Sequence, residues 1–122
     1  MVKLSPEPTP IGAAVLMRPA AEKLKSELAR VTLSEMKTPV VPNVDAVPNK
    51  ETAKVVDLLY RQMFSPVLWE NSVRTMAREG VELFVEVGPQ KVLTNLVKRI
   101  TPDIPCLHLE EMEEIEAVKG QL

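Results

Sequence analysis

The sequence is poor in the residues on which crosslinks, metal sites and many active sites depend. It contains one cysteine, Cys106, one histidine, His108, and 3% aromatic residues. A single cysteine excludes an internal disulfide and indicates a reducing, cytoplasmic setting. One cysteine and one histidine fall short of a tetrahedral metal site, and no glycine-rich phosphate loop is present. We therefore expect neither a metal nor a cofactor.

Charge and hydropathy exclude further classes of protein. The formal net charge is −2, from 15 basic and 17 acidic residues among 122. Binding to nucleic acid through phosphate contacts needs a basic face, so we expect no nucleic-acid partner. No apolar run approaches the roughly 18 residues that span a bilayer, so we expect no membrane partner. An apolar content of 45% instead indicates one folded domain.

Prolines and helical periodicity predict how the first part of the chain is organised. Alternate prolines in residues 1–12 predict a disordered leader. Apolar residues at spacings of three and four then predict a helix of about fourteen residues, with Pro19 in its first turn. A second helix is expected after an N-cap at Asn49. A third is expected to open with Ser65 as N-cap and to end at Gly80.

Three short segments predict strands. Residues 38–46 are rich in β-branched side chains, although Pro42 restricts them to a sheet edge. Residues 81–87 and 106–109 are the other two, and residues 92–100 between them predict a fourth helix. This alternation indicates an α/β fold with a mostly parallel sheet. Three strands make a thin sheet, so the chain resembles part of a larger fold.

Spacing alone predicts no active site. No serine lies in the G-x-S-x-G turn that exposes a nucleophile, and helix capping explains Ser65. Cys106 and His108 would share one face of a strand, so a thiol–imidazole pair is geometrically conceivable. The simpler interpretation of Cys106 is a small core residue. The glutamates of residues 110–122 predict an acidic mobile tail with a solvated face, not a metal site.

Four segments in a fixed order carry a resemblance to a known family. They are residues 16–24 (LMRPAAEKL), 41–46 (VPNVDA), 61–70 (RQMFSPVLWE) and 84–93 (FVEVGPQKVL). The set resembles the C-terminal third of the malonyl-CoA:acyl-carrier-protein transacylases, with the acyltransferase domains of polyketide synthases as the nearest alternative. The resemblance implies that residues 16–109 are the C-terminal portion of an acyltransferase domain. That portion would be a partial three-layer sandwich from an α/β-hydrolase-like large subdomain.

The same resemblance implies an activity that this chain is not equipped to perform alone. The family transfers malonyl groups from CoA to acyl carrier protein in fatty-acid biosynthesis, so malonyl-CoA and acyl carrier protein are the implied partners. In it, a serine in G-H-S-x-G carries the malonyl group, a histidine in F-H-S activates that serine, and an arginine binds the malonyl carboxylate. In an ungapped register the F-H-S residues fall on Gly12, Ala13 and Ala14. We therefore expect a truncated homologue with no catalytic residue, inactive alone.

Four residues match positions that support the active site in the family. Gln62 matches a glutamine whose main-chain carbonyl orients the histidine, and Asn43 matches a segment near the floor of the active site. Gly88 and Pro89 match the turn after the last long strand. The family more often has glycine at the position of Gln90, which leaves the local form of that turn open. Maintenance of the fold alone is the alternative role for all four.

Two further functions remain open at this level. A complementing fragment would dock on a separate N-terminal acyltransferase part, and this predicts a large exposed apolar face. A stand-alone α/β interaction module would instead be a soluble monomer that unfolds cooperatively.

Overall fold

The computed structural model describes residues 11–121 of the chain, and side chains from residue 15 to residue 120. These residues form two compact units, one ending at Thr75 and one beginning at Met76, and each is described by itself. The predicted leader lies outside the described residues, except that Ile11 and Gly12 belong to the first helix. No helix among residues 11–121 combines the length and the apolar character needed to cross a bilayer.

The first helix, α1, spans Ile11–Leu28 and is longer than predicted. Pro19 lies inside it and not in its first turn, so one internal hydrogen bond of the helix is missing at that point. Ala21 is fully buried, whereas the side chains of Val15 and Leu16 are 64% and 79% exposed. The first half of α1 therefore carries apolar surface that the described residues leave exposed.

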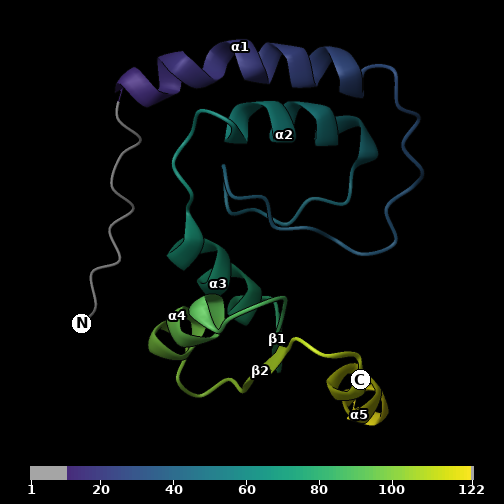
Figure 1. Ribbon diagram of the computed structural model, residues 1–122, viewed down its shortest axis with the longest axis vertical. Coiled ribbons are helices and arrows are strands. Elements are labelled where there is room, and N and C mark those ends of the chain that lie inside the picture. Colours follow the sequence, from purple (N-terminus) through teal and green to yellow (C-terminus); the bar gives the residue numbers. More distant parts are fainter. Residues whose placement is uncertain (1–10, 122) are drawn as a thin grey trace. The chain divides into compact units, whose positions relative to one another are not determined.

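Helix α1 lies alongside α2, which spans Val55–Gln62 (Figure 1). The guanidinium of Arg18 lies 4.4 Å from the centre of the Phe64 ring, and the ammonium of Lys25 lies 4.8 Å from the centre of the Tyr60 ring. A cation at such a distance over the face of an aromatic ring is attracted electrostatically by the quadrupole of the ring. Basic side chains of α1 thus contact one aromatic side chain of α2 and one in the turn that follows it.

The segment between α1 and α2 contains no strand within residues 29–51, so our prediction of a strand at residues 38–46 is wrong. An isolated antiparallel bridge joins Val40 to Asn49 instead. Pro42 cannot donate to a ladder, and Ala46 adopts a positive φ of 55°, which ends any extended conformation. These local features prevent this segment from forming a regular strand within the chain.

Asn49 is also not the N-cap that we predicted. Its side-chain oxygen accepts a hydrogen bond from the N–H of Glu51 at 3.2 Å, and its amide nitrogen donates to the Glu51 carbonyl at 3.1 Å. Glu51 is the residue before the short 3-10 helix η1, Thr52–Lys54, which leads into α2. Asn49 therefore closes a turn that begins two residues before Glu51, the residue at the N-cap position of η1.

Helix α3 spans Trp69–Arg78, and Gly80 ends it as predicted. Gly80 has a φ of +92°, and the N–H groups of Gly80 and Val81 donate to the carbonyls of Ala77 and Met76. This is the Schellman pattern, which satisfies the last carbonyls of a helix.

The start of α3 differs from the prediction, because Ser65 does not cap this helix. Its hydroxyl donates to the carbonyl of Arg61 at 2.6 Å and so closes α2. The main-chain N–H of Leu68 donates to the Asn43 carbonyl at 2.9 Å, and α3 begins at the next residue. The serine–proline pair thus ends one helix instead of opening the next.

The second unit is built around a parallel pair of strands, β1 at Phe84–Val87 and β2 at Cys106–Leu109. Helix α4, Val92–Ile100, forms the crossover between them and packs on both (Figure 1). The predicted α/β class and parallel pairing are confirmed, and so are β2 and α4. The sheet has two strands where three were expected, and β1 is shorter than the predicted residues 81–87.

Aliphatic side chains form most of the buried core of this unit. Val97, Ile100 and Leu109 are buried together with the single aromatic residue Phe84. The predicted acidic tail contains helix α5, Met112–Val118, and the short 3-10 helix η2, Lys119–Gln121.

A capping box begins α5, because Glu111 and Glu114 bond to each other's main-chain N–H groups. The Glu114 carboxylate also accepts a 2.6 Å hydrogen bond from the N–H of Glu110. These main-chain donors hold the pKa of Glu114 below its usual value.

Candidate functional site

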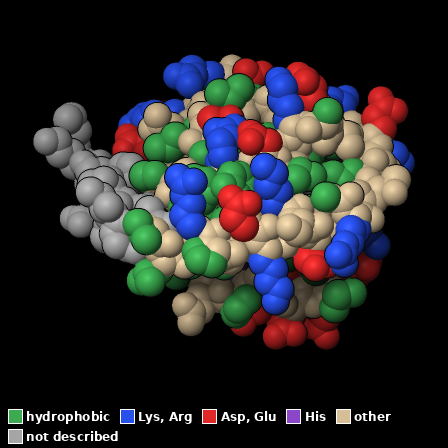
Figure 2. All heavy atoms as spheres, turned by 90° about the horizontal axis from the view of Figure 1, so that it is seen from above, with side chains coloured by type: hydrophobic (Ala, Val, Ile, Leu, Met, Phe, Trp, Pro, Cys, Tyr) green, Lys and Arg blue, Asp and Glu red, His purple; other side chains and the backbone are tan. Residues whose placement is uncertain are grey.

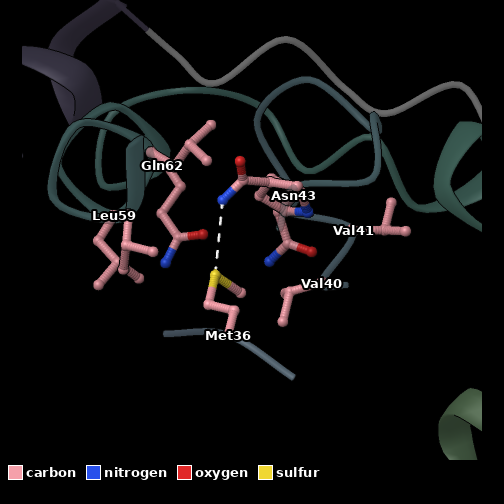
Figure 3. A pocket seen from close by; sticks show the side chains of 10 residues that line it. Met36, Val40, Val41, Asn43, Leu59 and Gln62 are labelled. Atoms are coloured by element: carbon pink, nitrogen blue, oxygen red, sulfur yellow. Dashed lines mark hydrogen bonds between the residues drawn. The ribbon is translucent and has the colours of Figure 1, made fainter. Parts of the chain in front are cut away.

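Two of the four predicted supporting residues, Asn43 and Gln62, line one pocket in the first unit. The pocket has a volume of about 410 Å³ and lies between residues 36–49 and the helix α2. Figure 3 shows Gln62 extending from α2, with Met36 on the opposite wall. The structure therefore brings together two residues that are nineteen positions apart in the sequence.

The lining of this pocket carries no charged side chain. It combines apolar residues with three carboxamides, and its members are Met36, Val40, Val41, Pro42, Asn43, Asn49, Val55, Leu58, Leu59 and Gln62. Asn49 is only 9% exposed, and its amide nitrogen lies 3.9 Å from the sulfur of Met36. Buried carboxamides with bonded neighbours hold loops in one conformation. Asn49 thus positions the segment that carries Asn43.

Gln62 is the last residue of α2, and the residue four positions after it is unusual for a helix end. A helical carbonyl normally accepts from the N–H four residues later, but residue 66 is proline, which has none. The bonds that close α2 go to Arg61 instead, whose carbonyl accepts from the Phe64 N–H at 3.4 Å and from the Ser65 hydroxyl. Pro66 thus withholds the usual helical donor from the Gln62 carbonyl. We did not predict this role of Pro66, although its spacing of four residues from Gln62 is a signal that can be read in the sequence.

The other two supporting residues, Gly88 and Pro89, lie in the second unit, directly after β1. Gly88 has a φ of +137°, which an L-residue rarely adopts, and Gln90 follows with a φ of 70°. The Gly88 N–H donates to the Leu109 carbonyl at 3.0 Å, and Nε2 of His108 lies 2.7 Å from the Gly88 carbonyl. A carbonyl only accepts, so this nitrogen carries a proton. Both contacts tie the turn to β2.

Glu86 fixes the other end of the same turn, a role that we did not predict from the sequence. Its carboxylate accepts hydrogen bonds from the hydroxyl and the N–H of Thr94 at 2.6 and 2.7 Å, and from the N–H of Leu93 at 3.1 Å. The Thr94 hydroxyl is the main reason that the pKa of Glu86 lies below its usual value. No known capping spacing joins residues seven and eight positions apart, so the sequence carried no signal for this contact.

The conceivable thiol–imidazole pair finds no support in the contacts of its two members. The imidazole of His108 bonds to Gly88, whereas the sulfur of Cys106 lies 3.9 Å from the carbonyl oxygen of Leu107. Within the part of the chain that the structure describes, no three potential ligands lie close enough together to hold a metal ion. The site residues that remain are therefore those of the pocket and of the Gly88–Pro89 turn.

Comparison with known proteins agrees with the resemblance seen in the sequence. The malonyl CoA-acyl carrier protein transacylase of Salmonella typhimurium is 45% identical over 106 residues, which are 87% of this chain and 34% of that protein. The crystal structure of an acyl carrier protein S-malonyltransferase from Vibrio cholerae superposes with a TM-score of 0.79 at 39% identity, over 88% of this chain and 35% of that one. No family profile matches the chain.

A third similar protein was solved as a complex. It is a malonyl-transacylase bound to a type II PKS acyl-carrier protein, with a TM-score of 0.81 at 28% identity, over 99% of this chain and 38% of that one. The chain thus spans about a third of the length of the relatives that it matches. The matched part is the C-terminal third of those relatives. The chain is therefore homologous to the C-terminal third of the malonyl CoA-acyl carrier protein transacylases.

Proposed function

We propose that this chain supplies the supporting part of a site that transfers a malonyl group from CoA to acyl carrier protein. The observation that carries the proposal is that one pocket gathers Gln62 and Asn43, in a chain that is 45% identical to a transacylase over 106 residues. In this role the Gln62 carbonyl accepts a hydrogen bond from the imidazole of a catalytic histidine. Pro66 favours this, because it removes the competing helical donor.

The second unit has a rigid element of its own, the turn after β1. Gly88 and Pro89 are held at one end by His108 and at the other by Glu86. A support fixed by several hydrogen bonds keeps its geometry when substrate binds, and such preorganisation lowers the cost of reaching the transition state. We assign these residues to positioning and not to catalysis.

The chain alone does not transfer malonyl groups in this proposal. Ala13 and Ala14 stand where the family has histidine and serine, and a methyl group cannot accept or donate a proton. The loss of both nucleophile and base raises a reaction barrier by about 8 kcal/mol, which is on the order of a millionfold in rate. The partners proposed here are malonyl-CoA, acyl carrier protein and a separate N-terminal acyltransferase part that brings the missing serine, histidine and arginine.

A transfer assay tests the proposal. The isolated chain, incubated with malonyl-CoA and acyl carrier protein carrying its phosphopantetheine, should form malonyl carrier protein no faster than a blank. Addition of the N-terminal two thirds of the Salmonella transacylase, ending after its F-H-S segment, should raise the rate well above that of either part alone. Gln62→Ala should keep this gain, because the proposed contact is made by the main chain.

Two results would count against the proposal. Turnover by the isolated chain above the blank would show that it has catalytic groups of its own. A mixture no faster than its separate parts would remove the supporting role.

A further inference from the structure

Residues 38–43 have the composition of a strand, but among the described residues those from Pro39 to Val41 have main-chain hydrogen bonds on one side only. Farther along, the Asn43 carbonyl accepts from the N–H of Leu68, so the open edge is limited to Pro39–Val41. The N–H of Val40 donates to the Asn49 carbonyl at 2.9 Å, and the Asn49 N–H donates to the Val40 carbonyl at 2.7 Å. In an extended chain the main-chain groups of neighbouring residues point to opposite edges. The N–H and carbonyl of Val41 therefore belong to the edge away from Asn49.

Apolar surface accompanies this edge. The side chain of Val40 is 55% exposed and lines the same uncharged pocket as Gln62 and Asn43. The face of the molecule seen in Figure 2 is a mixture of hydrophobic, basic and acidic side chains. An open apolar pocket beside an exposed valine is typical of a surface that another polypeptide covers.

The prolines limit what can pair with this edge. Pro39 has a carbonyl but no N–H, so Val41 supplies the N–H on the part of the edge that these two residues form. A second copy of the chain has the same deficit of donors at its own edge, which makes pairing between copies unfavourable. The complementary partner is a strand whose N–H groups meet the carbonyls of Pro39 and Val41.

We propose that this edge accepts one β-strand of the N-terminal acyltransferase part, and that apolar side chains of that strand enter the pocket. The inference rests on the proposed function, because the partner is the part assigned there. It adds the place of docking and explains the predicted strand at residues 38–46. The composition encodes a strand that forms only when a neighbour completes its hydrogen bonds.

Two variants of this chain test the place of docking. The partner is the N-terminal two thirds of the Salmonella transacylase, co-expressed with the full chain and measured as a purified complex. Val40→Lys should weaken binding at least tenfold, because it places a charge beside the pocket. Val47→Lys is the matched control, since Val47 is 57% exposed in the same segment but does not line this pocket. It should change binding less than twofold.

Hydrogen exchange gives a second measurement that needs no variant. The Val41 amide should exchange at least tenfold more slowly in the complex, whereas the Val40 and Asn49 amides change little, because they already bond to each other. Hydrogen exchange at Val41 therefore tests the docking site even if Val40→Lys fails to fold.

The possible failures are distinguishable. A complex in which both lysine variants bind equally, with unchanged exchange at Val41, overturns the docking site and leaves the proposed function standing. Absence of any complex with the unsubstituted chain overturns both. Protection of Val41 that rises with the concentration of the chain alone identifies a second copy as the occupant and also overturns the inference.

Discussion

The hydroxyl of Tyr60 on α2 donates a 2.5 Å hydrogen bond to the carboxylate of Glu22 on α1. This bond is the main cause that raises the pKa of Tyr60, and the guanidinium of Arg18 opposes it. A raised pKa means that folding favours the neutral phenol. The stabilisation that this hydrogen bond provides is complete below the pKa of tyrosine in the unfolded chain, near 10. It is lost as the pH rises through the higher pKa of Tyr60 in the folded protein.

This contact can be followed directly, because Tyr60 is the one tyrosine of the chain. Titration of tyrosinate absorbance in the native protein should give a midpoint above 10, and in the urea-unfolded chain a midpoint near 10. Glu22→Gln should move the native midpoint down, because it removes the negative charge beside the phenol. Circular dichroism at each pH is the control for folding. A native midpoint at or below 10 would contradict the contact between α1 and α2.

Glu86→Gln should destabilise the second unit at pH 7. The native carboxylate has a lowered pKa, so its contribution is present above the unfolded pKa and is lost as the pH falls through the native value. The difference in urea midpoint between Glu86→Gln and the unsubstituted chain should therefore be largest near neutral pH. It should shrink as the pH falls below about 4.5. Glu82→Gln, at an exposed position, is the control. A difference independent of pH would argue that Glu86 does not act through its charge.

Gly80→Ala should destabilise the chain by about 1–2 kcal/mol, because Gly80 has a φ of +92° and an L-residue resists this conformation. An added Cβ would meet no atom within 4 Å, so the cost arises from the backbone alone. Gly120→Ala is the matched control, with equal space and no positive φ. Urea unfolding measures both, and equal midpoints for the two variants would show that Gly80 is not strained.

Pro66→Ala should supply a main-chain N–H that donates a hydrogen bond to the Gln62 carbonyl. The new amide at residue 66 lies four positions after Gln62 and can continue the hydrogen bonding of α2, so it should exchange with solvent at least tenfold more slowly than an unprotected amide. Pro39→Ala places a new amide at an exposed position that pairs with no neighbour, and it should show no such protection. In the reconstituted transfer assay Pro66→Ala should lower the rate. Rapid exchange at residue 66 together with an unchanged rate would refute the proposed role of Pro66.

Local chemistry explains where the sequence-based predictions were accurate. Residues 92–100 form α4 as predicted, since their apolar stripe packs on both strands. Gly80 ends α3, because glycine tolerates the positive φ that the Schellman pattern requires. Residues 106–109 form β2 in parallel with β1. Each of these predictions depended on residues close together in the sequence.

The inaccurate predictions share a different cause, namely local signals with two possible outcomes. Ser65 can cap a following helix or close a preceding one, and its hydroxyl bonds to Arg61 behind it. Asn49 can cap a helix or close a turn, and it bonds to Glu51. Residues 38–46 need a neighbouring strand, and within the described residues Val40 finds only the bridge to Asn49. Pro19 is compatible with a first turn but lies inside α1.

The sequence by itself determined the relationship to the transacylases and the absence of histidine and serine at Ala13 and Ala14, because an ordered set of motifs survives in the order of the residues. It also determined the parallel α/β class, through the alternation of strand-like and helical segments. Only the tertiary structure decided that Gln62 and Asn43 line one pocket and that Glu86 and His108 hold one turn. Contacts between side chains distant in sequence depend on how helices and strands pack, and no local pattern of residues specifies that.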